Sequence, residues 1–106
     1  MPQYLYRIQL NPRLHQTEAW LKEDNQAVTD HFNYLVKLKD TGQLILAGRT
    51  QTDLSTTFGL VIFNANDEAE ALSIMNQDPS VIAGVMIPQL YPYSVALISE
   101  TNAKER

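Results

Sequence analysis

Residues 31–50 read HFNYLVKLKDTGQLILAGRT, and this stretch determines the fold more than any other. Its first half places apolar residues at helical spacing, and Gly42 is of the residue type that most often ends a helix. The run from Leu44 to Gly48 that follows is rich in strand formers. The stretch therefore predicts a helix from about Asn25 to Thr41 that leads through a tight turn into a strand.

Further helices and strands are predicted on both sides of this unit. They show a hydrophobic period or a run of strand formers, and together with the unit they cover residues 3–10, 25–41, 44–48, 58–63, 66–78 and 85–99. A short helical stretch capped by Thr17 is expected near Trp20, and the polar loop 50–57 is expected to be the mobile part. Pro88 and Pro92 mark bulges or an unpaired edge in the last strand, because proline cannot donate a backbone hydrogen bond.

The order of these elements is strand, helix, strand, strand, helix, strand. This split βαβ order is typical of a ferredoxin-like α+β fold, in which both helices cover one face of a four-stranded antiparallel sheet. The other face would stay uncovered and apolar, and face-to-face packing of two sheets in a homodimer is the simplest way to cover it. We expect one domain over residues 1–99 and a solvated tail over residues 100–106. Whether dimers assemble further stays open.

The composition excludes several classes of protein. With 106 residues, 44% hydrophobic and 19% charged, the chain fits one globular domain and is too short for a multidomain enzyme. A net charge of -4 without a basic patch argues against binding to nucleic acid. No segment reaches the roughly 20 apolar residues that span a bilayer, and the N-terminal segment lacks the pattern of a signal peptide. We expect a cytoplasmic protein that binds neither nucleic acid nor membranes.

Strong catalytic motifs do not occur in this sequence. It has no glycine-rich nucleotide loop, no GxSxG, no HExxH and no cysteine. Its two histidines are too few for most all-imidazole metal sites, so neither a metal nor a cofactor is expected. Two residues remain as candidates for chemistry. They are His31 and Asp78, the latter held out of helical conformation by Pro79.

The helical period also predicts which side chains point inward. At 100° per residue, the inward arc of the first helix contains His31, Phe32, Leu35, Val36 and Leu38, and that of the second contains Ala69, Leu72 and Met75. A histidine whose Nδ1 proton is accepted by a carboxylate is a common acid/base unit. His31 and Asp78 equally fit a hydrogen-bonded histidine at the core edge and a turn aspartate. Spacing alone does not show whether the two side chains meet.

An ordered set of short motifs extends over most of the chain. Its members follow one another as His31 and Leu35, Gly42, Ala47-Gly48, Gly59, Asp78-Pro79, Ala83-Gly84 and Pro92-Tyr93. As a set they resemble the YciI-like, or YCII-related, family. The resemblance implies a ferredoxin-like dimeric α+β barrel, similar to muconolactone isomerase. It also implies a pocket in which His31 and Asp78 are the catalytic pair.

Three features depart from the family pattern. Arg49 and Ser80 stand where many relatives carry a proline and an aromatic residue, and the loop 50–57 is short. Arg49 could clamp a substrate carboxylate, or pair with Asp53 on the surface. Ser80 and Tyr93 could line the same pocket. Alternatively, Ser80 caps a short helix and Tyr93 packs at the sheet edge.

With this resemblance, we expect a small homodimeric enzyme that transfers protons without a cofactor, of the lyase or isomerase kind. Its substrate would be a small organic molecule, anionic if Arg49 binds it. His31 would be the general acid/base, and Asp78 would orient it. The alternative is a non-catalytic dimer that binds a metabolite or another protein, since one fold hosts many functions. A haem-handling or cofactor-free oxygenase ranks third, because only His31 is an evident haem ligand.

Overall fold

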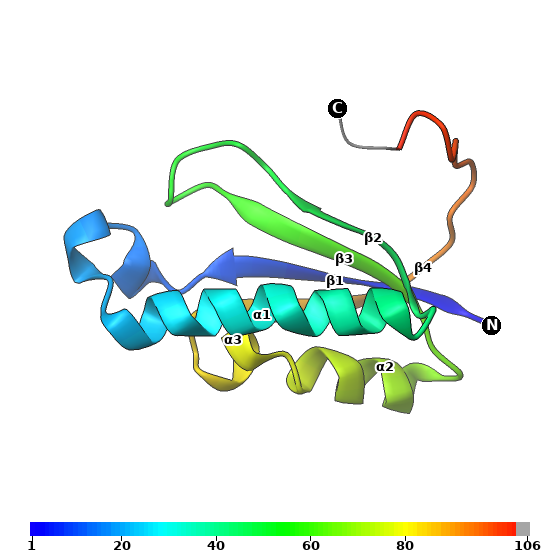
Figure 1. Ribbon diagram of the computed structural model, residues 1–106, viewed down its shortest axis with the longest axis horizontal. Helices are drawn as coiled ribbons and strands as arrows, with labels where there is room; N and C mark the ends of the chain where they lie inside the picture. Colours follow the sequence, from blue (N-terminus) through cyan, green and yellow to red (C-terminus); the bar gives the residue numbers. More distant parts are fainter. Residues whose placement is uncertain (104–106) are drawn as a thin grey trace.

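An antiparallel sheet of four strands forms one of the two layers of the protein in the computed structural model, which describes residues 1–103 (Figure 1). The strands, in the spatial order β2-β3-β1-β4, are β1 (Gln3–Leu10), β2 (Leu44–Arg49), β3 (Phe58–Asn64) and β4 (Met86–Tyr93). The helices are α1 (Lys22–Asp40), α2 (Glu68–Asn76) and α3 (Pro79–Ile82), and two 3-10 turns, η1 (Pro12–Leu14) and η2 (Thr17–Ala19), precede α1. The predicted ferredoxin-like α+β fold is confirmed.

The helices pack against one face of the sheet and form the main core with it. Alternate residues of β1 point to this side, and Tyr6 is fully buried between the sheet and the helices together with Phe63 of β3. Their rings meet edge to face, with centroids 5.7 Å apart. Gly59 of β3 packs closely here, because a Cβ at this position would lie 3.0 Å from Cγ1 of Ile8. The two central strands, β1 and β3, therefore carry a dense, aromatic core.

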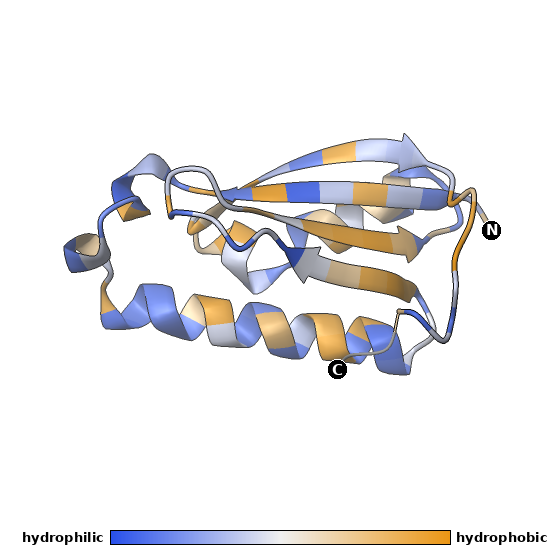
Figure 2. Ribbon diagram, turned by 90° about the horizontal axis from the view of Figure 1, so that it is seen from above, coloured by the Kyte–Doolittle hydropathy of each residue, from blue (hydrophilic) through white to orange (hydrophobic). Residues whose placement is uncertain are grey.

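The opposite face of the sheet is bare. Figure 2 views the strands from this side, with no helix in front of them. Four large apolar side chains of this face are exposed, namely Leu46, Ile87, Tyr91 and Tyr93. At its centre, the guanidinium of Arg7 lies 5.0 Å from the ring centroid of Phe58. This is the surface that the predicted homodimer would cover, and the assembly itself stays a prediction.

A smaller core holds the segment between β1 and α1. Its buried members are Leu10, Leu14, Ala27 and Val85, and Leu54 of the loop 50–57 packs against them. Thr17 does not cap a helix as expected, because its hydroxyl donates to Glu18 instead. The base of the loop 50–57 is closed by a hydrogen bond from the Thr50 amide to the Phe58 carbonyl. The mobility expected for this loop stays a prediction.

The ends of several elements differ from those predicted. α1 begins earlier, at Lys22, because the Asp24 carboxylate accepts the Leu21 amide and caps the first turn. Gly42 follows α1 with a φ of 84°, the left-handed conformation expected of a glycine after a helix. The last strand ends at Tyr93 rather than Ser99. It is an edge strand paired only with β1, as Pro88 and Pro92 indicated, and it has no bulge in that pairing.

The buried stripe of each helix differs from the predicted one. Phe32 and Val36 of α1 are 65% and 40% exposed, whereas Leu38 is buried. In α2 the buried residues are Ala71, Ile74 and Met75, and Ala69 and Leu72 face outward. In α1 the buried stripe is narrower than the predicted arc, whereas in α2 it is rotated toward Ala71 and Ile74. A helix contacts a sheet only along positions three and four residues apart, and the helical period alone does not fix which of these positions face the sheet.

The C-terminal segment after β4 forms no strand within the described residues. Residues 99–103 are exposed, as a solvated tail requires, and residues 104–106 of the predicted tail lie outside the described part of the chain. The domain boundary at residue 99 stays a prediction. Within residues 1–103, no helix has the length and apolar character needed to cross a membrane.

Candidate functional site

His31 and Asp78 meet on the helical side of the sheet. His31 lies on the inward stripe of α1, and Asp78 occupies the corner between α2 and α3, where Pro79 starts the short helix. The Nδ1 atom of His31 lies 2.7 Å from Oδ2 and 2.9 Å from Oδ1 of Asp78. These two residues, far apart in the sequence, therefore form a direct ion pair or hydrogen bond, depending on the protonation of the imidazole.

The Asp78 carboxylate is completely enclosed and well supplied with donors. It has no exposed surface, and it accepts the Tyr6 hydroxyl at 2.7 Å and the Ser80 hydroxyl at 2.8 Å. It also accepts the Ser80 amide at 3.0 Å, which makes it the cap of α3. Ser80 therefore does not cap this helix itself, because Asp78 holds the capping position.

The protonation state of Asp78 follows from these contacts. Burial alone raises the pKa of a carboxyl group, but hydrogen bonds from His31, Tyr6 and Ser80, with the charge of His31, outweigh burial and lower the pKa of Asp78. Burial, followed by the nearby charge of Asp78, raises the pKa of Tyr6. Asp78 is thus an anion at neutral pH, and Tyr6 stays a protonated donor to it.

His31 combines a fixed nitrogen with a free one. Its side chain is 12% exposed, and its Nδ1 faces the carboxylate. No residue between 1 and 103 forms a hydrogen bond with its other nitrogen, Nε2. Because the anion of Asp78 holds the proton on Nδ1, the lone pair of a neutral ring lies on Nε2. The arrangement can therefore accept a proton at Nε2 and stabilise the imidazolium that results.

Arg49 approaches the same side of the sheet as this pair. It pairs with Gly59 across the β2–β3 ladder, so its side chain points to the helical side, like that of Ala47. β2 runs back along α1 from the turn at Gly42 and ends beside the middle of the helix (Figure 2). Arg49 is exposed, and within the described residues it forms no ion pair, with Asp53 or with any other acid.

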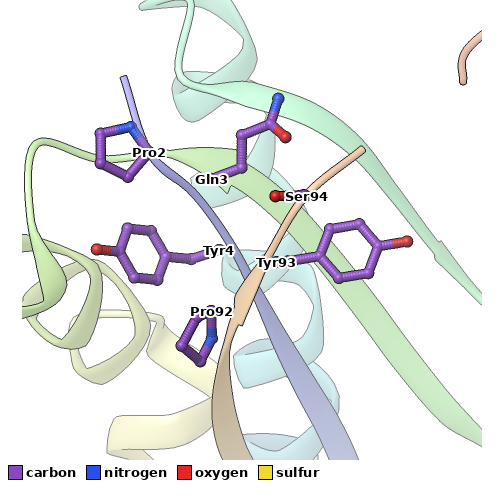
Figure 3. Close-up of a pocket in the computed structure, with 6 residues that line it drawn as sticks. All are labelled: Pro2, Gln3, Tyr4, Pro92, Tyr93 and Ser94. Carbon is purple, nitrogen blue, oxygen red and sulfur yellow. The ribbon is translucent and has the colours of Figure 1, made fainter. Parts of the chain in front are cut away.

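Tyr93 lies on the other face of the sheet. It stands opposite Gln3 in the β1–β4 ladder, and Figure 3 shows its ring on the opposite side of the strands from that of Tyr4. With Pro2, Pro92 and Ser94, these residues line a shallow hollow at the end of the sheet. The structure brings His31, Asp78 and Ser80 together and leaves Tyr93 apart from them within one chain.

The two best-formed hollows in the surface are not lined by His31 or Asp78. The hollow beside Tyr93 contains neither His31 nor Asp78. A second hollow, of about 440 Å³, lies between α1 and α3, and its lining includes Asp30 and Pro79, the chain neighbours of the pair. The imidazole therefore lies next to this hollow without forming its wall.

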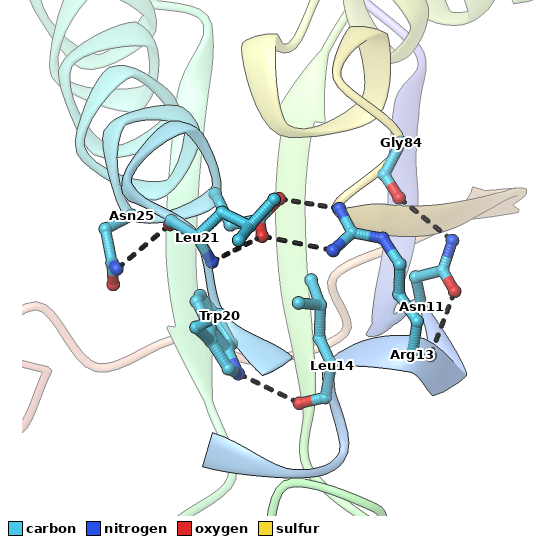
Figure 4. Close-up of polar contacts among 8 residues, drawn as sticks. Asn11, Arg13, Leu14, Trp20, Leu21, Asn25 and Gly84 are labelled. Atoms are coloured by element: carbon cyan, nitrogen blue, oxygen red, sulfur yellow. Dashed lines mark hydrogen bonds and ion pairs between the residues drawn. The ribbon is translucent and has the colours of Figure 1, made fainter. Parts of the chain in front are cut away.

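A second carboxylate is held in a similar way at the start of α1. The Asp24 oxygens lie 2.6 Å and 3.1 Å from the two terminal nitrogens of Arg13, and one of them accepts the Leu21 amide (Figure 4). The hydrogen bond from Arg13 is the main reason that the pKa of Asp24 is lowered. This pair ties the η1 turn to the start of α1.

Sequence reasoning missed Tyr6 and the Arg13–Asp24 pair. The alternation of β1 does place Tyr6 on the inward side, but nothing in a sequence shows which carboxylate its hydroxyl reaches. Among residues 1–103, no three His, Cys, Asp or Glu side chains are grouped so that they could hold a metal ion.

Comparison with known proteins gives a family and a structural neighbour. The sequence model of the YCII-related domain matches residues 11–92. The fold is similar to 5-chloro-2-hydroxyhydroquinone dehydrochlorinase from Burkholderia phenoliruptrix AC1100, solved in complex with 2,5-dihydroxybenzoquinone. The TM-score is 0.62 at 24% sequence identity, over 87% of this chain and 93% of the other. A search of curated proteins found no match.

Proposed function

The chain belongs to the family of YCII-related domains, and from this premise we propose that it is a cofactor-free acid/base enzyme of the lyase or isomerase kind. The observation that carries the proposal is the contact of 2.7 Å between His31 Nδ1 and the enclosed carboxylate of Asp78. A buried anion that fixes one imidazole nitrogen and leaves the other free is the arrangement of a general base.

In the proposed reaction, Nε2 of His31 takes a proton from the substrate. Asp78 keeps its charge throughout, because its donors stabilise the anion, and so it stabilises the imidazolium electrostatically. The imidazolium then returns the proton to another atom of the substrate, or to a leaving group. Isomerisation and elimination share this first step. The structural neighbour is a dehydrochlorinase, and loss of hydrogen chloride is an elimination of this kind.

The proposed substrate is a small organic molecule next to the exposed edge of the imidazole. Arg49 supplies a free guanidinium on the same side of the sheet, which favours an anionic substrate. Ser80 acts in this proposal through Asp78, since its hydroxyl donates to the carboxylate. Tyr93 would contact a substrate only from the bare face of the sheet.

We also propose a homodimer formed by two bare sheet faces. The exposed side chains of Leu46, Ile87 and Tyr91 on this face support it, because burying them against a second copy removes apolar surface from water. Ile87→Glu would place a charge in that interface. Sedimentation should then detect monomers, whereas Leu72→Glu on the outer side of α2 should leave the dimer intact. The cytoplasmic location and the lack of nucleic-acid binding stay predictions.

The alternative is a dimer that binds a small molecule without converting it. It is favoured by the observation that the hollow between α1 and α3 is lined by Asp30 and Pro79 and not by His31. A binding site there needs no proton transfer. The two functions differ in whether removal of the imidazole abolishes chemistry or leaves ligand binding unchanged.

The coupling of the pair is tested first, by NMR titration of both imidazoles in the natural chain and in Asp78→Asn. His15 is the internal reference. We expect the titration of His31 alone to change, because the amide that replaces the carboxylate carries no charge to stabilise the imidazolium. If the titration of His31 is the same in Asp78→Asn and in the natural chain, the acid/base pair does not operate and the binding function takes precedence.

The reaction is tested next with a defined probe. Release of chloride from 5-chloro-2-hydroxyhydroquinone and deuterium incorporation from D2O into small enolisable acids are followed for the natural chain and for His31→Gln. We expect His31→Gln to lower the rate by about 10²–10⁴-fold, the usual contribution of a general base. Arg13→Lys, which leaves the site untouched, is the control. Equal rates in the natural chain and His31→Gln would remove His31 from the reaction.

A further inference from the structure

The Tyr6 hydroxyl and the His31 imidazole share one oxygen of Asp78. Tyr6 donates to Oδ2 at 2.7 Å, and His31 Nδ1 lies 2.7 Å from the same atom. Tyr6 comes from the central strand and has no exposed surface, so its hydroxyl cannot turn to water. Phe63 packs against the tyrosine ring edge to face and restricts its movement.

The remaining groups around the carboxylate come from the other elements of the site. Ser80 of α3 donates to Oδ1 through its hydroxyl and its amide. Tyr34 of α1 is another titratable group nearby, and burial, followed by the charge of Asp78, raises its pKa. The Tyr34 hydroxyl, however, donates to the Ile74 carbonyl at 2.7 Å and not to the carboxylate. Tyr6 is thus the tyrosine that competes directly with His31 for Asp78.

We propose that Tyr6 is a positioning residue that limits how strongly Asp78 holds the His31 proton. It does so by donating to Oδ2, which lies 2.7 Å from Nδ1 and is nearer to it than Oδ1 at 2.9 Å. This hydrogen bond withdraws charge from Oδ2 and fixes the plane of the carboxylate. A base that is bound too tightly to its carboxylate keeps the proton and cannot return it. Tyr6 therefore helps the imidazole to release the proton that it has accepted. This role rests on the proposed acid/base function of the pair.

The direction of the effect follows from the shared oxygen. Without the tyrosine hydroxyl, Oδ2 carries more negative charge toward His31, and the imidazolium is stabilised. Tyr6→Phe should therefore raise the titration midpoint of His31, by about half a pH unit or more, because a hydrogen bond to a charged group is worth more than a neutral one. In any reaction that His31 catalyses, the pH–rate profile should move in the same direction.

The experiment compares two tyrosines that differ in their hydrogen-bond acceptor. Imidazole titrations by NMR are recorded for the natural chain, Tyr6→Phe and Tyr34→Phe, with His15 as internal reference. Phenylalanine keeps the ring that packs on Phe63, so the core is retained. We expect the His31 midpoint to rise in Tyr6→Phe and to stay within error in Tyr34→Phe. An unchanged midpoint in Tyr6→Phe, or equal changes in both variants, overturns the proposal.

A second measurement on the natural chain covers the case in which Tyr6→Phe does not fold. With tyrosines labelled at Cζ, the resonance of Tyr6 should follow the titration of His31, since the two donors share Oδ2. The resonance of Tyr34 should change much less. A Tyr6 resonance that does not change as His31 titrates overturns the proposal. This failure is distinct from failure of the acid/base function, which Asp78→Asn tests by removing the charge itself.

Discussion

Asp24 and Asp78 are two carboxylates at helix starts that make the same types of contact but have different roles. Each accepts a backbone amide, from Leu21 in one case and Ser80 in the other, and each contacts a basic side chain. The partner of Asp24 is Arg13, a permanent cation whose side chain is 45% exposed. The partner of Asp78 is His31, which can lose its proton and is 12% exposed.

The basic partner, and not the carboxylate, determines what such a pair can do. Asp24 contacts both terminal nitrogens of Arg13, whose charge is permanent, so this pair cannot exchange a proton with a substrate and fastens the η1 turn to α1. His31 uses one nitrogen for Asp78 and keeps the other. Lowered carboxyl pKa values occur at both places, and therefore do not by themselves distinguish a structural pair from a chemical one.

Removal of the enclosed carboxylate should have the largest effect on stability. Asp78→Ala leaves the hydroxyls of Tyr6 and Ser80 and the imidazole of His31 without their acceptor. Loss of one partner of a buried pair costs about 3–5 kcal/mol in free energy of unfolding. Urea denaturation of the variant and of Asp24→Ala measures the contrast. Equal losses in the two variants would show that the deeper burial of the His31–Asp78 pair does not separate it from the Arg13–Asp24 pair.

The pH dependence of stability below neutral pH should show the same contrast between Asp78 and Asp24. A carboxyl group with a lowered pKa in the folded state contributes stability above its unfolded value of about 3.9, and this contribution is lost as the pH falls through the folded value. Both Asp24 and Asp78 act in this direction. We expect Asp78→Asn to flatten the loss of stability below about pH 5 more than Asp24→Asn does. Thermal or urea unfolding between about pH 2 and 7 checks it, and a steeper acid slope in Asp78→Asn would contradict it.

The sequence predicts where the residues of the His31–Asp78 site lie on their helices and strands better than it predicts their side-chain contacts. Alternation in β1, the helical period before Gly42 and the proline after Asp78 are local signals, and they place His31 on an inward stripe and Asp78 in a corner. That the two side chains meet comes from the packing of α1 on α3, which the family resemblance implied and spacing could not show. The Tyr6 contact joins β1 to the α2–α3 corner and has no local signal. Phe32 was misplaced because a helical period does not reveal how wide a stripe the sheet covers.

Arg13→Lys should have a smaller effect on stability, and the effect should be confined to the Arg13–Asp24 pair. Lysine keeps the positive charge but loses the two parallel hydrogen bonds of the fork, so the η1 turn is held less firmly. We expect a small decrease in the midpoint of thermal unfolding and no change in the titration of His31. Calorimetry and imidazole NMR on the same sample measure both. A shift of the His31 titration would show that the start of α1 is coupled to the site.

A change in salt concentration should have the smallest effect on stability, and this effect should differ between the two pairs. The Arg13 side chain is 45% exposed, so dissolved ions reach its charge, whereas the Asp78 carboxylate is out of contact with solvent. At an ionic strength of about 1 M the screening length falls to about 3 Å, which weakens exposed pairs and affects enclosed ones much less. The destabilisation caused by Asp24→Ala should therefore shrink between low and high salt, while that caused by Asp78→Ala stays constant. Unfolding of the natural chain and both variants in sodium chloride measures this difference. Parallel changes in the two variants would mean that solvent reaches both carboxylates, and the imidazole of His31 would then lack the enclosed anion on which its role as a base depends.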